Sequence, residues 1–186
     1  MKGQQVSLQK HVQNRNPGHI ILVYLCDINK QLPGVLEREI KRSFDTDVEI
    51  RFKPWNLNFA YNKHRKKYSS AQLLRRLRQL ERRRGDKILG IVDVDIYSPG
   101  WEFIFGEAEI NSSTAIISLF LLKPEHNSKG NDDALFKKRA VKEAIHELGH
   151  LYGHGHCLNN KCVMFLSKSL GAIDRKNKII CETCRN

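Results

Sequence analysis

Four histidines, one glutamate and one cysteine lie within the twelve residues HELGHLYGHGHC that begin at His146. His146 and His150 are four residues apart, so on a helix both imidazoles project from one face and can bind the same ion, with Glu147 beside them. Imidazole nitrogen is a common zinc ligand, and a catalytic zinc has three protein ligands and one open position for water. The pair therefore indicates a zinc site that needs one more protein ligand.

His156 has the right side chain for the third ligand, but a continuous helix would direct it to another face. Gly153 solves this problem, because glycine readily adopts a positive φ and can turn the chain back toward the metal. The full pattern is H-E-x-x-H-x-x-G-x-x-H, which is far more specific than H-E-x-x-H alone. The alternative for these histidines is a solvent-facing or capping role near a helix C-terminus. His154 departs from the spacing, and we interpret it as an ordinary exposed residue.

Four of the five cysteines lie in the last thirty residues, as a C-x4-C pair and a C-x-x-C pair. They are Cys157, Cys162, Cys181 and Cys184. Two such pairs suit a closed tetrahedral zinc site, which has no open position and stabilises the fold rather than performing catalysis. Two disulfides or four unlinked thiols are the alternatives. Cys26, within an apolar run, is expected to be a small buried core residue.

The elements that must position these groups follow from hydrophobic periodicity. Apolar runs rich in β-branched residues predict strands at residues 19–26, 48–52 and 88–96. Helical spacing predicts one helix that ends near residue 44, one at residues 70–84, and a long one that begins at the N-cap candidates Asp132 and Asp133. Residues 101–110 and 114–122 predict a hairpin or an edge strand, and residues 55–68 and 124–131 are expected to be loops. This order favours an α/β or α+β domain with helices packed on a mixed sheet.

The length of 186 residues allows a substantial core, and we expect one domain over residues 1–186. The longest apolar runs, residues 20–26 and 115–122, are too short to span a bilayer, and the polar N-terminus has no secretory hydrophobic region. A soluble, cytoplasmic monomer is therefore expected. In such a reducing compartment, clustered cysteines are more often metal ligands than disulfides.

The net charge of +12 is concentrated in residues 51–87, which contain 13 Lys and Arg against Glu81 and Asp86. Lysines at residues 63–67 and the arginines of the helix expected at residues 70–84 form a basic patch near Tyr61 and Tyr68, a pattern that nucleic-acid interfaces also have. The alternative is a solvated helix face, which is common in a chain with 28% charged residues. We favour the solvated face and do not expect nucleic acid as a partner.

The combined pattern resembles the archaemetzincins, a family of zinc metallopeptidases in the metzincin clan. The residues that carry this resemblance are His146, Glu147, His150, Gly153, His156, Cys157, Cys162, Met164, Cys181 and Cys184. The resemblance implies a metzincin-like, mostly parallel twisted sheet with an antiparallel edge strand, packed on helices, and the zinc-binding helix below it. It also implies a sheet-and-helix part over residues 1–153 and a small zinc-stapled part over residues 154–186.

Met164 would then be the Met-turn methionine, which packs beneath the catalytic zinc without ligating it. The sequence departs from the family pattern in two places. The gap between Met164 and Cys181 is one residue shorter than is typical of the family, and the chain continues for only two residues after Cys184. The C-terminal helix expected from relatives should therefore be short or absent.

Metal-dependent hydrolysis of peptide bonds is the activity that the resemblance implies, with two zinc ions per chain, one catalytic and one structural. His146, His150 and His156 would leave the fourth position of the catalytic zinc to water, whose acidity the ion raises. Glu147 would take the proton of that water as it attacks a peptide carbonyl, then pass the proton to the leaving amine.

An extended peptide or protein substrate would pair with the antiparallel edge strand, for which residues 101–110, with apolar Phe103 and Phe105, are the candidate. The alternative function is a zinc-stabilised protein that binds peptide or nucleic acid and has little or no peptidase activity. All the catalytic residue types are present in either case, so the sequence does not separate the two.

Overall fold

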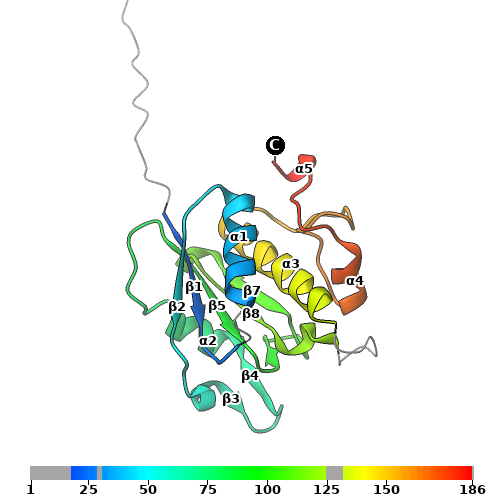
Figure 1. Cartoon of the computed structure of the whole chain (residues 1–186). Coiled ribbons are helices and arrows are strands. Elements are labelled where there is room, and N and C mark those ends of the chain that lie inside the picture. The colour runs from blue at the N-terminus through cyan, green and yellow to red at the C-terminus, as the bar shows by residue number, and fades with distance from the viewer. Residues whose placement is uncertain (1–17, 29–30, 125–131, 186) are drawn as a thin grey trace, which may run out of the picture.

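The computed structural model describes residues 18–28, 31–124 and 132–185, and its centre is a five-stranded sheet with the order β2-β1-β5-β8-β7 (Figure 1). The strands are β1 (Ile20–Tyr24), β2 (Val48–Phe52), β5 (Lys87–Val92), β7 (Gly106–Glu109) and β8 (Thr114–Ser118). Strands β2, β1, β5 and β8 are parallel, and β7 pairs antiparallel with β8 at the edge. This arrangement confirms the predicted mixed, mostly parallel sheet with an antiparallel edge strand.

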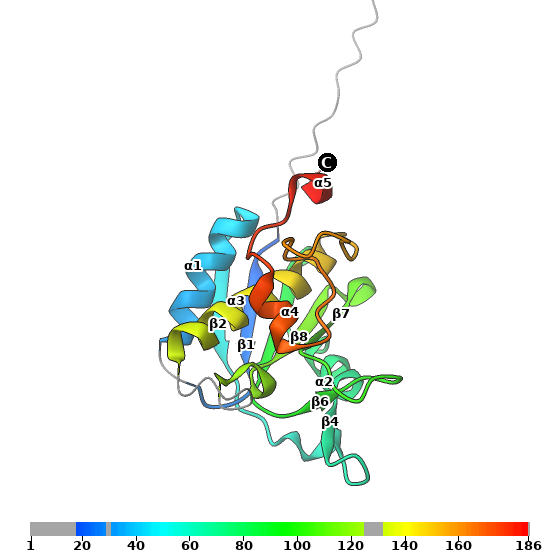
Figure 2. The same ribbon diagram turned by 90° about the vertical axis from the view of Figure 1, so that its right-hand side faces the viewer.

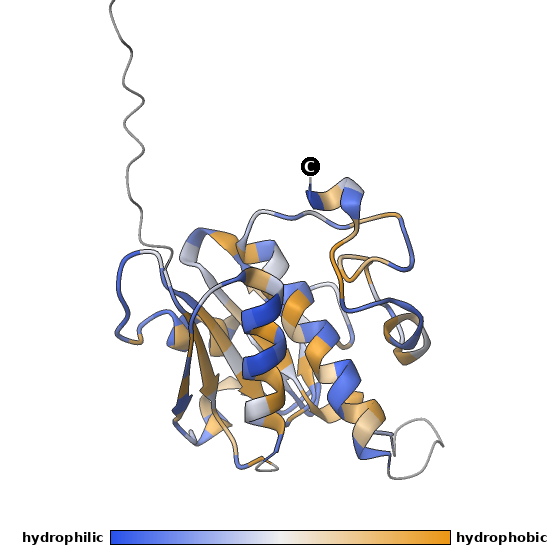
Figure 3. Cartoon of the chain, turned by 45° about the horizontal axis from the view of Figure 1, so that its top comes forward, coloured by the Kyte–Doolittle hydropathy of each residue, from blue (hydrophilic) through white to orange (hydrophobic). Residues whose placement is uncertain are grey.

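Strand β1 is buried along its whole length, as expected for a parallel strand covered on both faces. Ile20, Leu22 and Tyr24 belong to a core cluster with α1 (Leu32–Phe44) and α3 (Asp133–Leu151). Ile21 and Val23 point to the other face and pack with α2 (Ser70–Leu77). Figure 3 accordingly shows the strands as largely hydrophobic and the helices as mixed.

Helices α1 and α3 pack against each other on one face of the sheet. Helix α1 ends at residue 44, as predicted, where Asp45 takes the left-handed conformation with φ 46°. Helix α3 begins after Asp132, whose side chain accepts a hydrogen bond of 2.9 Å from the backbone N–H of Leu135. The predicted long helix and one of its two N-cap candidates are therefore confirmed.

Helix α2 is shorter than predicted, because it ends at Leu77 rather than near residue 84. Hydrogen bonds join the following residues to β2 and to the connection between β7 and β8. The Arg51 guanidinium donates to the Glu81 carbonyl at 2.7 Å, and the Arg82 guanidinium donates to the Ser112 carbonyl at 2.6 Å. Leucine spacing alone had suggested that the helix continues to residue 84. In the structure, contacts with distant segments take the place of these last helical turns.

A second, three-stranded sheet lies beside α2, where the sequence predicted a loop at residues 55–68 and a single long strand at residues 88–96. It contains β3 (Tyr61–Asn62), β4 (Lys67–Ser69) and β6 (Ile96–Tyr97), and the 3-10 helix η1 (Leu57–Ala60) precedes it. The Asn62 side chain accepts hydrogen bonds from the backbone N–H groups of His64 and Arg65, which closes the turn between β3 and β4. Both predictions are corrected, because such short strands have too few residues to show a period.

The hairpin of β7 and β8 is confirmed, with the 3-10 helix η2 (Ile110–Ser112) between the strands and Ser113 at φ 49°. Regular pairing of the edge strand begins at Gly106, so residues 101–105 are not part of it. The apolar run at residues 114–122 also divides, into β8 and the 3-10 helix η3 (Phe120–Leu122). The loop predicted at residues 124–131 lies outside the described residues except for Pro124.

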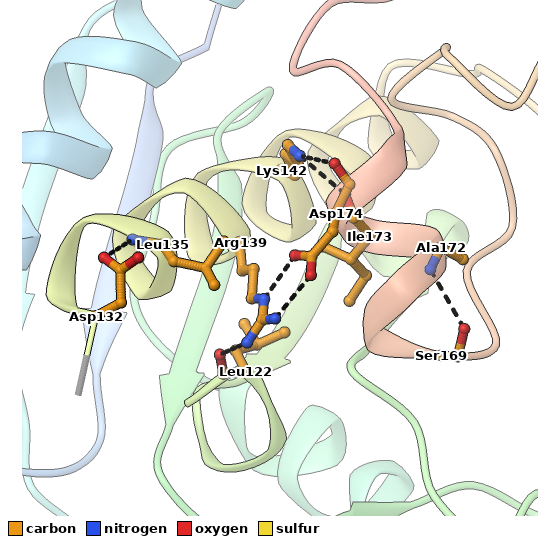
Figure 4. A network of polar contacts seen from close by, with 9 residues as sticks. All are labelled: Leu122, Asp132, Leu135, Arg139, Lys142, Ser169, Ala172, Ile173 and Asp174. Carbon is orange, nitrogen blue, oxygen red and sulfur yellow. Dashed lines mark hydrogen bonds and ion pairs between the residues drawn. The ribbon is translucent and has the colours of Figure 1, made fainter. Parts of the chain in front are cut away.

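The C-terminal part has little regular structure, namely α4 (Leu170–Arg175) and the four-residue α5 (Glu182–Arg185). The terminal helix is thus short, as expected. Figure 2 shows α4 beside α3, and the two helices are joined by a partly buried ion pair in which the Arg139 guanidinium contacts Asp174 at 2.7 and 2.8 Å (Figure 4). Lys142 donates to the carbonyls of Ile173 and Asp174. Among the described helices, none is long and apolar enough to cross a membrane.

Candidate metal centres and catalytic cleft

The C-terminus of α3 turns the chain back as the glycine position predicted. Gly153 has φ 91°, its N–H donates to the His150 carbonyl at 3.0 Å, and the N–H of His154 donates to the Gly149 carbonyl at 3.0 Å. These two bonds define a Schellman motif, which satisfies the last helical carbonyls and reverses the chain direction. The reversal brings residue 156 next to the helix face that carries His146 and His150.

The three predicted ligands come together in the structure. The ligand nitrogens of His146, His150 and His156 all lie within 4.8 Å of one another. The Nε2 atoms of His146 and His150 are 3.3 Å apart, and the His156 ring centroid lies 5.4 and 4.8 Å from those of the other two. His146 is buried, whereas His156 is exposed at the mouth of a cleft. The spacing of the motif therefore corresponds to a real three-imidazole group.

Backbone carbonyls orient two of the three rings. His146 Nδ1 lies 2.8 Å from the Val163 carbonyl, and His150 Nδ1 lies 2.8 Å from the His154 carbonyl. A carbonyl oxygen only accepts hydrogen bonds, so each Nδ1 carries the proton and each Nε2 presents a lone pair to the centre of the group. Two lone pairs facing each other fit a cation between them, which is the arrangement of histidine-bound zinc with its supporting hydrogen bonds.

His154, interpreted from the sequence as an ordinary exposed residue, is instead partly buried, and its side chain lies outside the group. It still contributes through its backbone carbonyl, which accepts the hydrogen bond from His150. No property of the His154 side chain could have indicated this, because the contact depends only on the path of the chain after Gly153.

The environment keeps the three imidazoles neutral, as metal ligands must be. Burial lowers the pKa of His146 well below its usual value, and the positive charge of Lys176 lowers it further. Burial also lowers the pKa of His150 and that of the more exposed His156. The group therefore offers lone pairs rather than protons at neutral pH.

Glu147 lies at the wall of the same cleft and is buried. Its pKa is raised well above the usual value, chiefly by burial and also by the negative charges of Glu143 and Glu107, while Lys176 acts in the opposite direction. A carboxylate with a raised proton affinity is suited to accept and return a proton.

A buried ion pair supports this face of α3. Lys176 Nζ lies 2.8 Å from Glu143 Oε1, and both side chains are almost fully buried, with 0% and 4% exposure. Glu143 lies one helical turn before Glu147, so helical periodicity could have placed it on the site face. Lys176 comes from the segment between α4 and the last cysteine pair, and no sequence signal predicts its partner.

Met164 packs directly beneath the helix that carries the histidines. A Cβ atom added at Gly149 would lie 2.5 Å from Met164 Sδ, so the absence of a side chain at Gly149 makes room for the methionine. Met164 is fully buried, and its carbonyl accepts a hydrogen bond from the N–H of Cys157. Met164 thus packs against the histidine-bearing helix at Gly149, and the part played by Gly149 was not foreseen.

The histidine group opens into a cleft of about 500 Å³ between the edge of the sheet and the C-terminal part. Strand β7 and the preceding residues 101–105 line one side. Leu166 and Lys168 line the other side, and Lys168 Nζ lies 5.3 Å from the centre of the Trp101 ring. The cleft therefore runs beside a partly exposed edge strand, which is a surface to which an extended chain can add.

The four C-terminal cysteines form a second group. Their Sγ atoms all lie within 4.8 Å of one another, and those of Cys157 and Cys181 are 3.8 Å apart. Four sulfurs at about 2.3 Å from a zinc ion lie roughly 3.8 Å apart in a tetrahedron. Every cysteine is free, so the disulfide alternative is excluded for this structure. Cys26 is only partly buried in the loop after β1, where it donates to the Ile91 carbonyl, which corrects the prediction of a core position.

Hydrogen bonds distribute the protons unequally among these thiols. Desolvation opposes ionisation of Cys181, but hydrogen bonds from the Cys184 backbone and from neighbouring thiols lower its pKa to about 7. The pKa of Cys184 is raised to about 12 because its thiol is hydrogen-bonded to Cys157 and because of desolvation. Four thiolates at this separation repel one another unless a cation lies between them, and zinc supplies that charge. The donor set therefore fits zinc.

Known proteins share this architecture. The family model "Peptidase family M54" matches residues 22–186. An archaemetzincin from Methanocaldococcus jannaschii is 41% identical over 170 residues, which cover 89% of this chain and 92% of that protein. An archaemetzincin from Pyrococcus horikoshii is 51% identical over 96 residues, which cover 52% of this chain and about half (51%) of that protein. The crystal structure of a zinc-dependent peptidase from Methanocorpusculum labreanum superimposes with a TM-score of 0.81 at 28% identity, covering 89% of this chain and 97% of that chain.

Proposed function

Because the chain belongs to peptidase family M54, the archaemetzincins, and is a zinc metallopeptidase, we propose that it is of the metzincin type and that His146, His150 and His156 hold its catalytic zinc. One observation carries this assignment. The carbonyls of Val163 and His154 hold the Nδ1 protons of two rings, so that both Nε2 lone pairs converge on one point beside the third ring.

Zinc held by three imidazoles acidifies a bound water and polarises a peptide carbonyl. Glu147 accepts the proton of the attacking water as the new bond to the carbonyl carbon forms, and it then donates that proton to the leaving amine. Its burial and raised proton affinity support this double role. Met164 supports the ligand helix from below without contributing a ligand.

The substrate is a peptide or protein segment in an extended conformation. Within the described part of the chain, strand β7 pairs with β8 on one side only, and the cleft lies along the same strand. An extended peptide can add to such an edge through backbone hydrogen bonds, which orient the scissile bond without requiring a particular sequence.

Cys157, Cys162, Cys181 and Cys184 hold a second, structural zinc, giving two zinc ions per chain. The free thiols and their separations support this assignment. The chain then forms one catalytic domain, with a sheet-and-helix part at residues 1–153 and a zinc-stapled part at residues 154–186. A reducing compartment such as the cytoplasm suits unpaired thiols of this kind, and a monomer is sufficient because one chain supplies every group of the site.

The basic segment serves the fold rather than a nucleic-acid partner. The Lys67 ammonium lies 2.9 Å from a carboxylate oxygen of Asp95, and the Arg78 guanidinium lies 3.4 Å from one of Glu109. The Arg76 guanidinium stacks on Trp55, 4.8 Å from the centre of the ring. Arg51 and Arg82 donate to backbone carbonyls of neighbouring segments. Cations committed to intramolecular contacts are less available to phosphates, which supports the solvated-face interpretation.

The test measures zinc content and peptide hydrolysis together in Glu147→Gln and His150→Ala. Glu147→Gln preserves side-chain size but removes the base, so both zinc ions should remain while turnover falls about a hundred- to ten-thousand-fold. His150→Ala should lose the histidine-bound zinc alone and retain one zinc per chain. Unchanged turnover in Glu147→Gln would refute the role of Glu147, and a parent protein with a single zinc would refute the two-site assignment.

A further inference from the structure

Gly106 is the first residue of β7, and it faces the helix that carries the histidines. Side chains alternate along a strand, so Gly106 and Ala108 share one face. Ala108 packs against the core cluster that contains α3, and β7 is in contact with α3. Gly106 therefore lies at the point where the edge strand passes closest to the proposed general base.

The space that a side chain would occupy at Gly106 is filled by Glu147. A Cβ atom added at Gly106 would lie 2.7 Å from Cγ, 2.7 Å from Oε1 and 2.9 Å from Cδ of Glu147. These separations are well below the ordinary contact distance between such atoms. Three of the five side-chain heavy atoms of Glu147, including one carboxylate oxygen, therefore depend on the missing side chain for their position.

We propose that Gly106 is a positioning residue for the hydrolytic reaction, because it leaves open the space in which the Glu147 carboxylate reaches the cleft. This inference rests on the proposed role of Glu147 as general base. It adds a requirement that the zinc-binding motif does not contain, since Gly106 lies 41 residues before Glu147 in the chain.

The strand that carries Gly106 and the helix that carries Glu147 are both held in place. A clash caused by a side chain at residue 106 would therefore displace the Glu147 side chain. Gly106 is paired with Ile117 of β8, and the adjacent Phe105 carbonyl accepts a hydrogen bond of 2.8 Å from the N–H of Ser118. On the other side, α3 packs against the sheet, and the ring of His146 next to Glu147 is held by the Val163 carbonyl. The strand and the helix cannot separate without breaking these bonds, whereas the carboxylate can rotate out of place.

Gly106→Ala should lower kcat about a hundredfold or more, which is the lower range of general-base contributions. KM should change little, because the backbone edge of β7 that binds the substrate is retained, and both zinc ions should stay bound. Gly34→Ala is the matched control, since a Cβ atom at Gly34 meets nothing within 4 Å, and its turnover should equal that of the parent. A kcat for Gly106→Ala within about twofold of the parent, at unchanged zinc content, overturns the proposal.

A thermodynamic cycle with Glu147→Ala tests the same contact without using activity. If Gly106 serves only to accommodate Glu147, Gly106→Ala should lower the melting temperature in the parent but not in the Glu147→Ala background, where the space is empty. An equal decrease in both backgrounds would assign Gly106 a merely structural role and overturn the proposal. Failure of the general-base assignment gives a different result, because the stability coupling would then persist while Glu147→Gln retained its turnover.

Discussion

The histidine group and the cysteine group differ in what holds their ligands. His146 and His150 lie on a 19-residue helix that packs against the sheet, and backbone carbonyls orient both rings. The cysteines come from segments with little regular structure, and Cys157, Cys181 and Cys184 are only partly buried. Their nearest supports are N–H groups, such as that of Cys181, which donates to Cys162 Sγ at 3.3 Å.

This difference supports the proposal that the two groups hold zinc for two different tasks. A helix packed on a sheet can hold two of the three proposed ligands in place without the metal, because its own core provides the stability. A loop-rich segment cannot hold its ligands in place without the metal, so metal binding must contribute directly to the free energy of folding. The two groups are linked, since the turn after α3 leads from His156 straight to Cys157.

The largest effect is expected from breaking the cysteine group. Zinc bound by four thiolates contributes on the order of 10 kcal/mol to the folding of small zinc domains, so Cys181→Ser should lower the zinc content and strongly lower the melting temperature. His150→Ala should lose one zinc with a much smaller thermal shift, because α3 retains its packing. Equal thermal shifts in the two variants would contradict the distinction between a catalytic and a structural site.

The buried pair of Lys176 and Glu143 should come next, because it joins the ligand helix to the segment before the last cysteines. Lys176→Met leaves a buried carboxylate without its partner, which typically costs about 3–5 kcal/mol in the free energy of unfolding. The double variant Lys176→Met with Glu143→Gln should recover most of this loss. Chemical denaturation of the zinc-loaded protein measures both.

Lys178→Met is the control for that pair. Its partner is Glu39, and the Lys178 side chain is 45% exposed, so the loss should be about 0–1 kcal/mol. If Lys176→Met lowers the free energy of unfolding no more than Lys178→Met does, the buried pair contributes no more to stability than the exposed one.

A smaller effect is expected for the pH dependence of folding stability in the metal-free protein. The pKa of His146 is lowered by burial in the folded state, so between that value and about 6.5 the unfolded chain binds a proton that the folded chain does not. Stability should therefore be unaffected by His146 above pH 6.5 and should fall below it, by up to about 1.4 kcal/mol per pH unit. His146→Asn should remove this dependence, and a pH profile identical to that of the parent would contradict it.

The smallest effect is expected for the binding of nucleic acid to the basic segment. Contacts through phosphates alone should appear at low salt and disappear steeply as salt rises, whatever the sequence of the nucleic acid. Fluorescence anisotropy with RNA and DNA oligonucleotides from low to physiological salt measures this. A selective complex that persists at physiological salt and is lost on replacing Arg75, Arg76 and Arg78 would reverse our interpretation of the basic segment.

Predictions from local patterns were confirmed where the pattern was long or chemically constrained. The helix that carries His146 and His150, its N-cap at Asp132 and the turn at Gly153 all follow from spacing along one stretch of chain. The edge hairpin was also confirmed, but its strand begins at Gly106 rather than at residue 101. Short elements failed, including the β3–β4 hairpin and the end of α2, because a few residues show no period and distant side chains compete for their backbone groups.

The types and spacing of the proposed ligands follow from the sequence alone, because metal chemistry restricts which side chains can serve and helix geometry restricts their separation. Only the tertiary structure decided what supports them. The Val163 carbonyl at His146, the Lys176 charge near Glu147 and the open space at Gly106 each join segments that lie from 17 to 41 residues apart in the chain. Such contacts leave no periodic trace in the sequence, since they depend on how separate elements pack rather than on the geometry of any one of them.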